Sequence, residues 1–80
     1  MNDLTPREME VVKLIGRGWV RHRIAAHLGV KCSAIVAYCA VIRMKLGVNN
    51  DVKIALMAHR LGVVRLEDID FGESMEVVSE

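Results

Sequence analysis

The 80-residue sequence predicts an all-α domain of four helices at residues 1–65, followed by an acidic tail at residues 66–80. Apolar residues recur at helical spacing in four segments, a glycine follows each segment, and no stretch alternates as a strand does. Hydrophobic residues make up 52% of the chain, which is enough for one small core. The longest unbroken apolar run, residues 34–42, is too short to span a bilayer, and no signal peptide opens the chain. We therefore expect a cytoplasmic protein.

The first helix has the strongest start signal in the sequence. Thr5 can cap it, Pro6 fits the first helical position, and Glu8 completes a capping box. The apolar stripe that follows consists of Val11, Val12, Leu14 and Ile15. Gly16 and Gly18 are expected to end the helix.

A short second helix is predicted from Val20 to Leu28, and a longer third helix from Ser33 to Leu46. Gly29 supplies the turn between them, and Gly47 ends the third helix. The positions expected to face the core are Ile24, Ala25, Leu28, Ile35, Cys39, Ile42 and Leu46. A short helix, a glycine turn and a longer helix are typical of a helix-turn-helix motif.

The fourth helix is predicted from Asp51 to Leu61, with Asn50 as its N-cap and Gly62 as its stop. Its expected inward residues are Ile54, Ala55, Ala58 and Leu61. With the first helix, it would complete a four-helix domain around the helix-turn-helix.

The net charge of +1 conceals an uneven distribution. Residues 1–65 hold all eleven Lys and Arg with only four acids, whereas residues 66–80 hold six acids and no base. A basic body suits a polyanion such as DNA. Two interpretations of the tail remain open: a solvated segment, or one that folds back on the basic face or docks on a partner.

Several strings at matching spacing resemble the LuxR/GerE-type helix-turn-helix domain. They are Leu4-Thr5-Pro6-Arg7-Glu8, Glu10-Val11-Val12, Gly18, Ile24-Ala25, Leu28-Gly29, Ile42 and Lys45-Leu46-Gly47-Val48. The resemblance covers residues 4–64 and implies a domain that binds DNA through its third helix and often dimerises through its fourth. It also implies a stand-alone member, because a chain of 80 residues leaves no room for a sensory or receiver domain in front.

The third helix departs from the family pattern and is a divergent recognition helix. Lys31 stands where the family's cap Ser is expected, Val36 where a Lys is usual, and Tyr38 where a His is usual. Ala34 replaces a Thr, and Val20 replaces the Ser that usually caps the second helix.

The outward positions of the third helix are predicted to be Ser33, Val36, Ala37, Ala40 and Met44. Base readout in the major groove uses bidentate Arg, Lys, Asn or Gln side chains, and none of these is on that face. We expect weak direct readout, limited to Ser33 and apolar contacts with thymine methyls. The apolar face could instead be a protein interface, or be covered by the tail through Ile69, Phe71 or Met75.

Basic residues around the helix-turn-helix are expected to bind DNA phosphates without reading sequence. The expected DNA contacts are Arg21, His22, Arg23, Lys31, Ser33, Val36, Ala37, Ala40, Arg43 and Lys45. The expected dimer or partner interface is Val36, Ala40 and Met44 on the third helix, with Val52, Leu56 and His59 on the fourth. Trp19 has two interpretations: it is a partly buried plug that fills the space between the first two helices, or it is a residue of an interface.

No catalytic constellation or nucleotide-binding motif is recognisable, so we expect no enzyme and no cofactor. The residues His22, His27, Cys32 and Cys39 match no familiar zinc spacing, so no metal site is expected. Seven helical residues separate the two cysteines by about 10 Å, which is too far for a disulfide.

Two functions follow from these observations. The first is a small dimeric transcription regulator, anchored on double-stranded DNA mainly by phosphate contacts. The alternative is a protein-binding anti-activator or co-regulator that uses its apolar third helix to bind another transcription factor.

Overall fold

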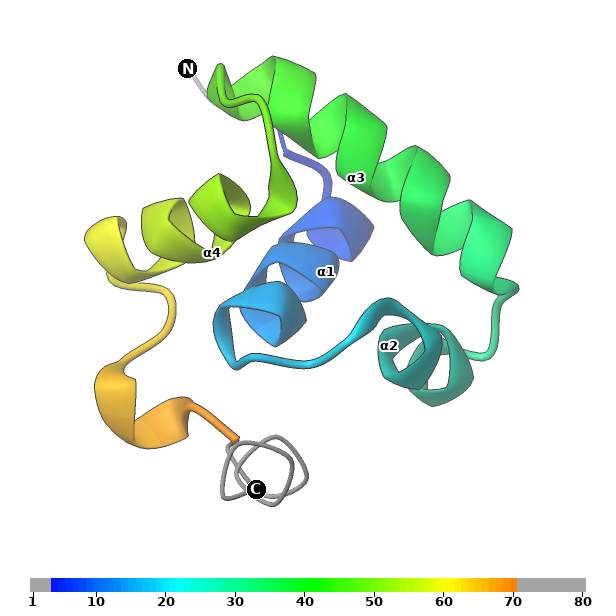
Figure 1. Ribbon diagram of the computed structural model, residues 1–80, viewed down its shortest axis with the longest axis horizontal. Coiled ribbons are helices and arrows are strands. Elements are labelled where there is room, and N and C mark those ends of the chain that lie inside the picture. Colours follow the sequence, from blue (N-terminus) through cyan, green and yellow to red (C-terminus); the bar gives the residue numbers. More distant parts are fainter. Residues whose placement is uncertain (1–3, 71–80) are drawn as a thin grey trace, which may run out of the picture.

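The computed structural model of the chain describes residues 4–70 and is helical throughout, with no strand in that range. The elements in order are α1 (Pro6–Gly16), α2 (Arg21–Leu28), α3 (Cys32–Leu46), α4 (Asp51–Arg60) and the 3₁₀ turn η1 (Leu66–Asp68). Helix α1 lies at the centre, with α3 across one side and α4 and α2 at opposite flanks (Figure 1). The predicted all-α, four-helix class is confirmed.

The start of α1 is built as the sequence predicts. The Thr5 hydroxyl accepts a hydrogen bond from the Glu8 N–H at 3.1 Å, and the Glu8 carboxylate accepts one from the Thr5 N–H at 2.9 Å. Pro6 occupies the first turn, where no backbone donor is needed. This reciprocal capping fixes both the first residue of α1 and the position of the Glu8 side chain.

Helices α2 and α3 form the helix-turn-helix unit. Gly29 adopts a left-handed conformation at φ 72°, which favours glycine, and the two helix axes are bent by 108° around it.

Within residues 4–70 no single helix is long and apolar enough to cross a membrane. Only α2 and α3 counted together, across their bend, reach that length and composition.

Helix α4 begins at the predicted cap, where the Asn50 side chain accepts the Lys53 N–H at 2.9 Å. The helix ends at Arg60, and two of its expected inward residues differ from the prediction. Leu61 is 45% exposed and Ala55 is only half-buried. Ala58 packs against Gly16, the last residue of α1, whereas Leu61 is the C-cap that follows the last turn of α4.

The core lies where α1, α3 and α4 meet, with α2 packed on α3. Its fully buried large side chains are Val11, Val12, Ile24, Ile35, Cys39, Ile42 and Ile54. Half-buried side chains at its rim include Trp19, Leu28, Tyr38 and Leu46. The inner stripe predicted for α3 is therefore correct, except that Leu46 is at the rim.

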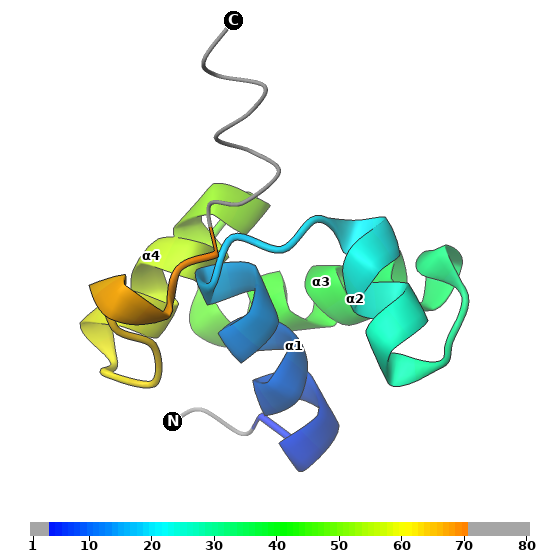
Figure 2. The ribbon, with the colours of Figure 1, turned by 90° about the horizontal axis from the view of Figure 1, so that it is seen from below.

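Residues 66–70 return to the body of the domain. After η1, the Asp70 N–H donates to the carbonyl oxygen of Arg17 at 2.7 Å, beside the loop that joins α1 to α2 (Figure 2). Ile69 lies next to Gly18, so it is not the residue that covers the outer face of α3, one of three candidates named from the sequence. Phe71 and Met75, the other two candidates, lie outside the described residues, and the division of the chain at residue 65 stays a prediction.

We predict that Gly16→Ala destabilises the domain, although alanine favours helices. A Cβ at this position would lie 2.8 Å from the Ala58 Cβ and 2.9 Å from Val64 Cγ2, so α1 and α4 would have to separate. The expected loss is about 1–3 kcal/mol in the free energy of unfolding, measured by chemical denaturation. Lys13→Ala, at an exposed site of the same helix, is the control. If Gly16→Ala were as stable as Lys13→Ala, the close approach of α1 to α4 at Gly16 would be contradicted.

Candidate nucleic-acid interface

The outer face of α3 is apolar and uncovered by any described residue. Val36 is 44% exposed and Met44 is 82% exposed, and the neighbouring Val41, not singled out from the sequence, is 40% exposed. The remaining predicted outward residues, Ser33, Ala37 and Ala40, are exposed as well. The prediction of an outward apolar face is therefore correct.

An open groove of about 320 Å³ runs beside this face. Its lining residues are Glu8, Ala34, Ala37, Tyr38 and Val41. Tyr38 is half-buried and forms part of the groove wall. The apolar surface of α3 thus extends from its outer face toward the start of α1.

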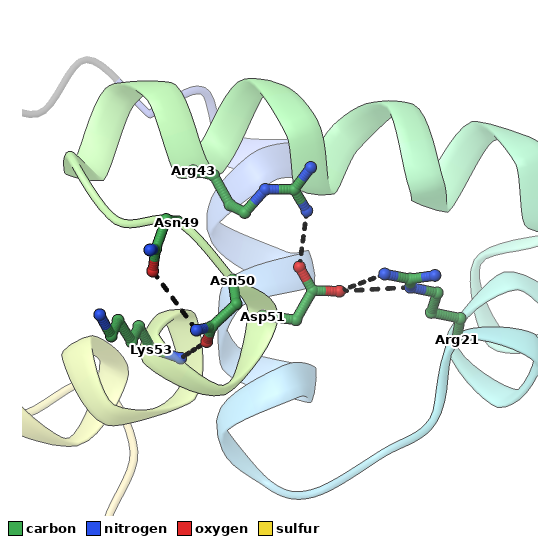
Figure 3. Close-up of polar contacts among 6 residues, drawn as sticks. All are labelled: Arg21, Arg43, Asn49, Asn50, Asp51 and Lys53. Carbon is green, nitrogen blue, oxygen red and sulfur yellow. Dashed lines mark hydrogen bonds and ion pairs between the residues drawn. The ribbon is translucent and has the colours of Figure 1, made fainter.

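Asp51 joins three helices through one carboxylate (Figure 3). At the start of α4, its Oδ2 accepts from Arg21 Nη2 at 2.6 Å and from Arg21 Nε at 3.2 Å, while its Oδ1 accepts from Arg43 Nη1 at 2.8 Å. Arg21 opens α2, and Arg43 lies in the last turns of α3. We call these three residues the Asp51 cluster.

The Asp51 cluster shapes the charge states around it. Partial burial alone would raise the pKa of Asp51, but the hydrogen bonds and positive charges of Arg21 and Arg43 outweigh burial and hold it below its ordinary value. Burial, with the Asp51 charge nearby, raises the pKa of the Cys39 thiol. Cys39 is therefore a neutral core residue, and neither it nor the exposed Cys32 forms a disulfide.

Arg23 belongs to a second cluster, at the turn between α1 and α2. Its guanidinium carbon lies 3.8 Å from the Trp19 ring centre, and its Nη1 donates to Asp70 Oδ2 at 2.7 Å. The His27 ring meets the Trp19 ring edge-on, with centres 5.1 Å apart. Trp19 is half-buried against the core, which agrees with the plug interpretation.

Lys45 lies in the last turn of α3 and binds an acid of α1. Its Nζ is 2.8 Å from Glu8 Oε1, at the opposite end of α3 from Lys31 and Ser33. The Lys45 ammonium, together with the Thr5 N–H, lowers the pKa of Glu8. The Glu8 carboxylate thus both caps α1 and binds α3.

The four helix N-termini fall into two kinds. Helices α1 and α4 have side-chain caps, Thr5 and Asn50, and an acidic residue in the first turn. Helices α2 and α3 have neither: Val20 and Lys31 occupy their cap positions without a side-chain hydrogen bond, and no acid is in the first turn. Among the four helices, therefore, only the two of the helix-turn-helix begin with neither a side-chain cap nor an acid of their own first turn.

Basic and polar side chains surround these two N-termini. His22 is exposed in the first turn of α2, and Lys31 and Ser33 are exposed at the start of α3. Lys31 has no acidic partner within residues 4–70. An anion held there would meet backbone donors, the helix dipole and a cation together.

The outer face of α4 carries two of the predicted interface residues. Val52 is 69% exposed and Leu56 is 62% exposed, one helical turn apart on the same side. His59 is half-buried instead, and its Nε2 lies 3.0 Å from the carbonyl oxygen of Gly16. His59 is thus occupied within the domain, beside the end of α1.

The sequence reasoning missed the acidic partners of the basic residues. Asp51 was considered only as the first residue of a helix and Glu8 only as a capping residue, yet each binds a predicted DNA contact. These pairs join residues 30 and 37 positions apart, so no local pattern could have indicated them. The acidic first turn of α4 was the only available signal.

Comparison with known protein families finds one match. The family described as bacterial regulatory proteins, luxR family, matches residues 2–58, which is more than two thirds of the chain. The matched range includes α1, α2 and α3 and most of α4. No curated protein sequence matches the chain.

We predict that Asp51→Asn lowers the free energy of unfolding by about 1–2 kcal/mol at neutral pH, because two arginines lose their shared carboxylate. Since folding lowers the pKa of Asp51, its contribution is present above the ordinary value, near pH 4, and disappears as pH falls through the folded value. The difference between variant and wild type should therefore shrink in acid. Urea unfolding across pH measures it.

Glu67→Gln is the matched control, because the Glu67–Arg65 pair is wide at 3.5 Å and both side chains are exposed. It should change stability little. Equal losses for the two variants, or an Asp51→Asn loss that does not depend on pH, would contradict the role of the Asp51 cluster.

Proposed function

Because the chain belongs to the LuxR family of bacterial regulatory proteins, a family of DNA-binding transcription regulators rather than enzymes, we propose that it binds double-stranded DNA mainly through phosphates. The observation that carries this proposal is the pair of N-termini at α2 and α3 that have neither a side-chain cap nor a first-turn acid. Backbone N–H groups at such N-termini bind phosphate oxygens in many proteins. The proposed phosphate contacts are Arg21, His22, Arg23, Lys31, Arg43 and Lys45.

The ion pairs of Arg21 and Arg43 with Asp51 leave part of their hydrogen-bonding capacity free. Arg21 and Arg43 together offer ten N–H donors, and only three of their nitrogens bind Asp51. The cluster retains one net positive charge. It can therefore present two oriented guanidinium groups to a phosphate while Asp51 holds them in place.

Base recognition is proposed to be weak. With Ser33, Val36, Ala37 and Ala40 toward the major groove, one hydroxyl and a set of methyl groups face the base edges. Bidentate contacts contribute about 1–3 kcal/mol of discrimination each, and this surface offers none. Affinity should therefore depend on salt more than on sequence.

We propose that the protein acts as a homodimer through α4. Val52 and Leu56 form an exposed apolar pair on that helix. Such a pair is suited to packing against its own copy across a two-fold axis. The cytoplasmic location expected from the sequence stays a prediction.

A second function is favoured by the exposed face of α3 and its groove. Val36, Val41 and Met44 form an apolar surface of a kind that commonly marks protein interfaces. A co-regulator or anti-activator would bury this face against another transcription factor instead of DNA.

We predict that the protein binds duplexes of unrelated sequence with similar affinity. If six residues contact phosphates, affinity should fall by roughly 10³-fold between about 50 and 200 mM salt. Lys31→Ala should weaken binding to every duplex and make the logarithmic salt slope shallower by about 0.9. Fluorescence anisotropy with full-length protein measures both quantities. Lys13→Ala, an exposed lysine outside the proposed contacts, is the control. No binding at low salt would contradict the DNA-binding proposal.

Val36→Lys separates the two functions. If α3 enters the DNA groove, a lysine at this exposed position should raise DNA affinity by about 3-fold or more, because it adds a cation. If the face binds a protein, the substitution should disrupt assemblies, measured by sedimentation, and leave DNA affinity unchanged. Val52→Lys on α4 is the matched control, which should weaken the homodimer alone. Unchanged behaviour of Val36→Lys in both assays would contradict both functions.

A further inference from the structure

The turn between α1 and α2 holds the chain segment that leads into the C-terminal residues. The Asp70 N–H donates to the Arg17 carbonyl oxygen at 2.7 Å, and the Asp70 carboxylate accepts from Arg23 Nη1 at 2.7 Å. Ile69 completes the contact, since its Cγ2 would lie 3.7 Å from a Cβ placed on Gly18. A backbone bond, an ion pair and an apolar contact therefore meet within two residues, and we call this contact the Asp70 latch.

The domain residues that bind Asp70 are held in place by contacts of their own. Gly18 has a φ of 92°, which lets the chain turn and leaves the Arg17 carbonyl oxygen available to Asp70. Arg23 is held flat by its stacking on Trp19, 3.8 Å from the ring centre. The Trp19 contact restricts the movement of the guanidinium whose Nη1 donates to Asp70.

Arg23 cannot serve Asp70 and a DNA phosphate with the same donor. A carboxylate and a phosphate oxygen both bind the edge of a guanidinium, and both are anions. The latched carboxylate also reduces the positive potential at the start of α2, where Arg21 and His22 lie in the same turn. Latch closure and phosphate binding at Arg23 therefore oppose each other.

The residues that follow the latch strengthen this opposition by their charge. Beyond Asp70 the sequence contains Glu73, Glu76 and Glu80 and no basic residue. The covalent link to Asp70 tethers this acidic charge to the domain while the latch is closed. An acidic segment tethered there has a high effective concentration against the same cations that would bind DNA.

We propose that the surface formed by Arg17, Gly18, Trp19 and Arg23 is a docking site for the chain's own acidic C-terminal segment, which competes with DNA for Arg23. This inference rests on the proposed DNA-binding function and adds its regulation. The segment lowers DNA affinity in proportion to the time that the Asp70 latch is closed. Opening the latch exposes Arg23 for phosphate.

Asp70→Asn in the full chain tests the proposal, with Asp68→Asn as the matched control. Both variants remove one negative charge within three residues, but Asp68 accepts only the Arg65 N–H of its own turn, at 3.1 Å. We expect Asp70→Asn to raise affinity for a duplex about 3-fold or more above Asp68→Asn at low salt. In an Arg23→Ala background the same substitution should add no such gain, because the contested residue is absent.

Trp19 fluorescence provides a second measurement without DNA, because Trp19 is the only tryptophan in the chain. Opening the latch removes the Asp70 carboxylate from the guanidinium that lies over the ring, so Asp70→Asn should shift the emission and Asp68→Asn should not. Equal DNA affinities for the two variants would overturn the competition even if DNA binding itself is strong. If no form binds DNA, the proposed function fails and the competition with it, and an unchanged Trp19 emission in Asp70→Asn would overturn the docking site as well.

Discussion

The Asp51 carboxylate is the interaction on which the arrangement of the helix-turn-helix depends. It binds Arg21 at the start of α2 and Arg43 near the end of α3, and it is itself the first residue of α4. Because the carboxylate is partly buried and its two oxygens bind different arginines, neither α2 nor α4 can move against α3 without breaking a charged hydrogen bond. The contact fixes the geometry at the face where DNA-binding helices must be aligned.

The acids Glu8 and Asp51 occupy similar positions in their helices. Glu8 and Asp51 lie in the first turns of α1 and α4, where they satisfy helix N-termini and also bind basic residues of α3 or α2. The first turns of α2 and α3 contain no acid of their own and no side-chain cap. Both uncapped helix starts therefore belong to the helix-turn-helix, and the outer face of α3 presents apolar side chains. This combination favours an anionic ligand held by its backbone and contributes little to distinguishing one base sequence from another.

The elements of this fold follow from short-range chemistry, and the sequence predicts them well. The Thr5 capping box, the Asn50 cap and the left-handed glycines at 29 and 47 define the helix ends within a residue or two. The apolar spacing of α3 also predicts which face is exposed. Leu61 was predicted inward because helical phase does not reveal where a neighbouring helix stops. The ion pairs Arg21–Asp51, Lys45–Glu8 and Arg23–Asp70 link residues 30 to 47 positions apart, and only the folded chain brings them together.

Amide chemical-shift mapping of the isotope-labelled full chain, titrated with a short duplex, tests the central claim most directly. The account predicts the largest changes at the first-turn amides of α2 and α3, those of His22, Cys32 and Ser33. The amides of Glu8 and Lys53, already bonded to Thr5 and Asn50, serve as internal controls and should change little. The account would be contradicted if the largest chemical-shift changes occurred at Glu8 and Lys53 while the first-turn amides of α2 and α3 did not shift.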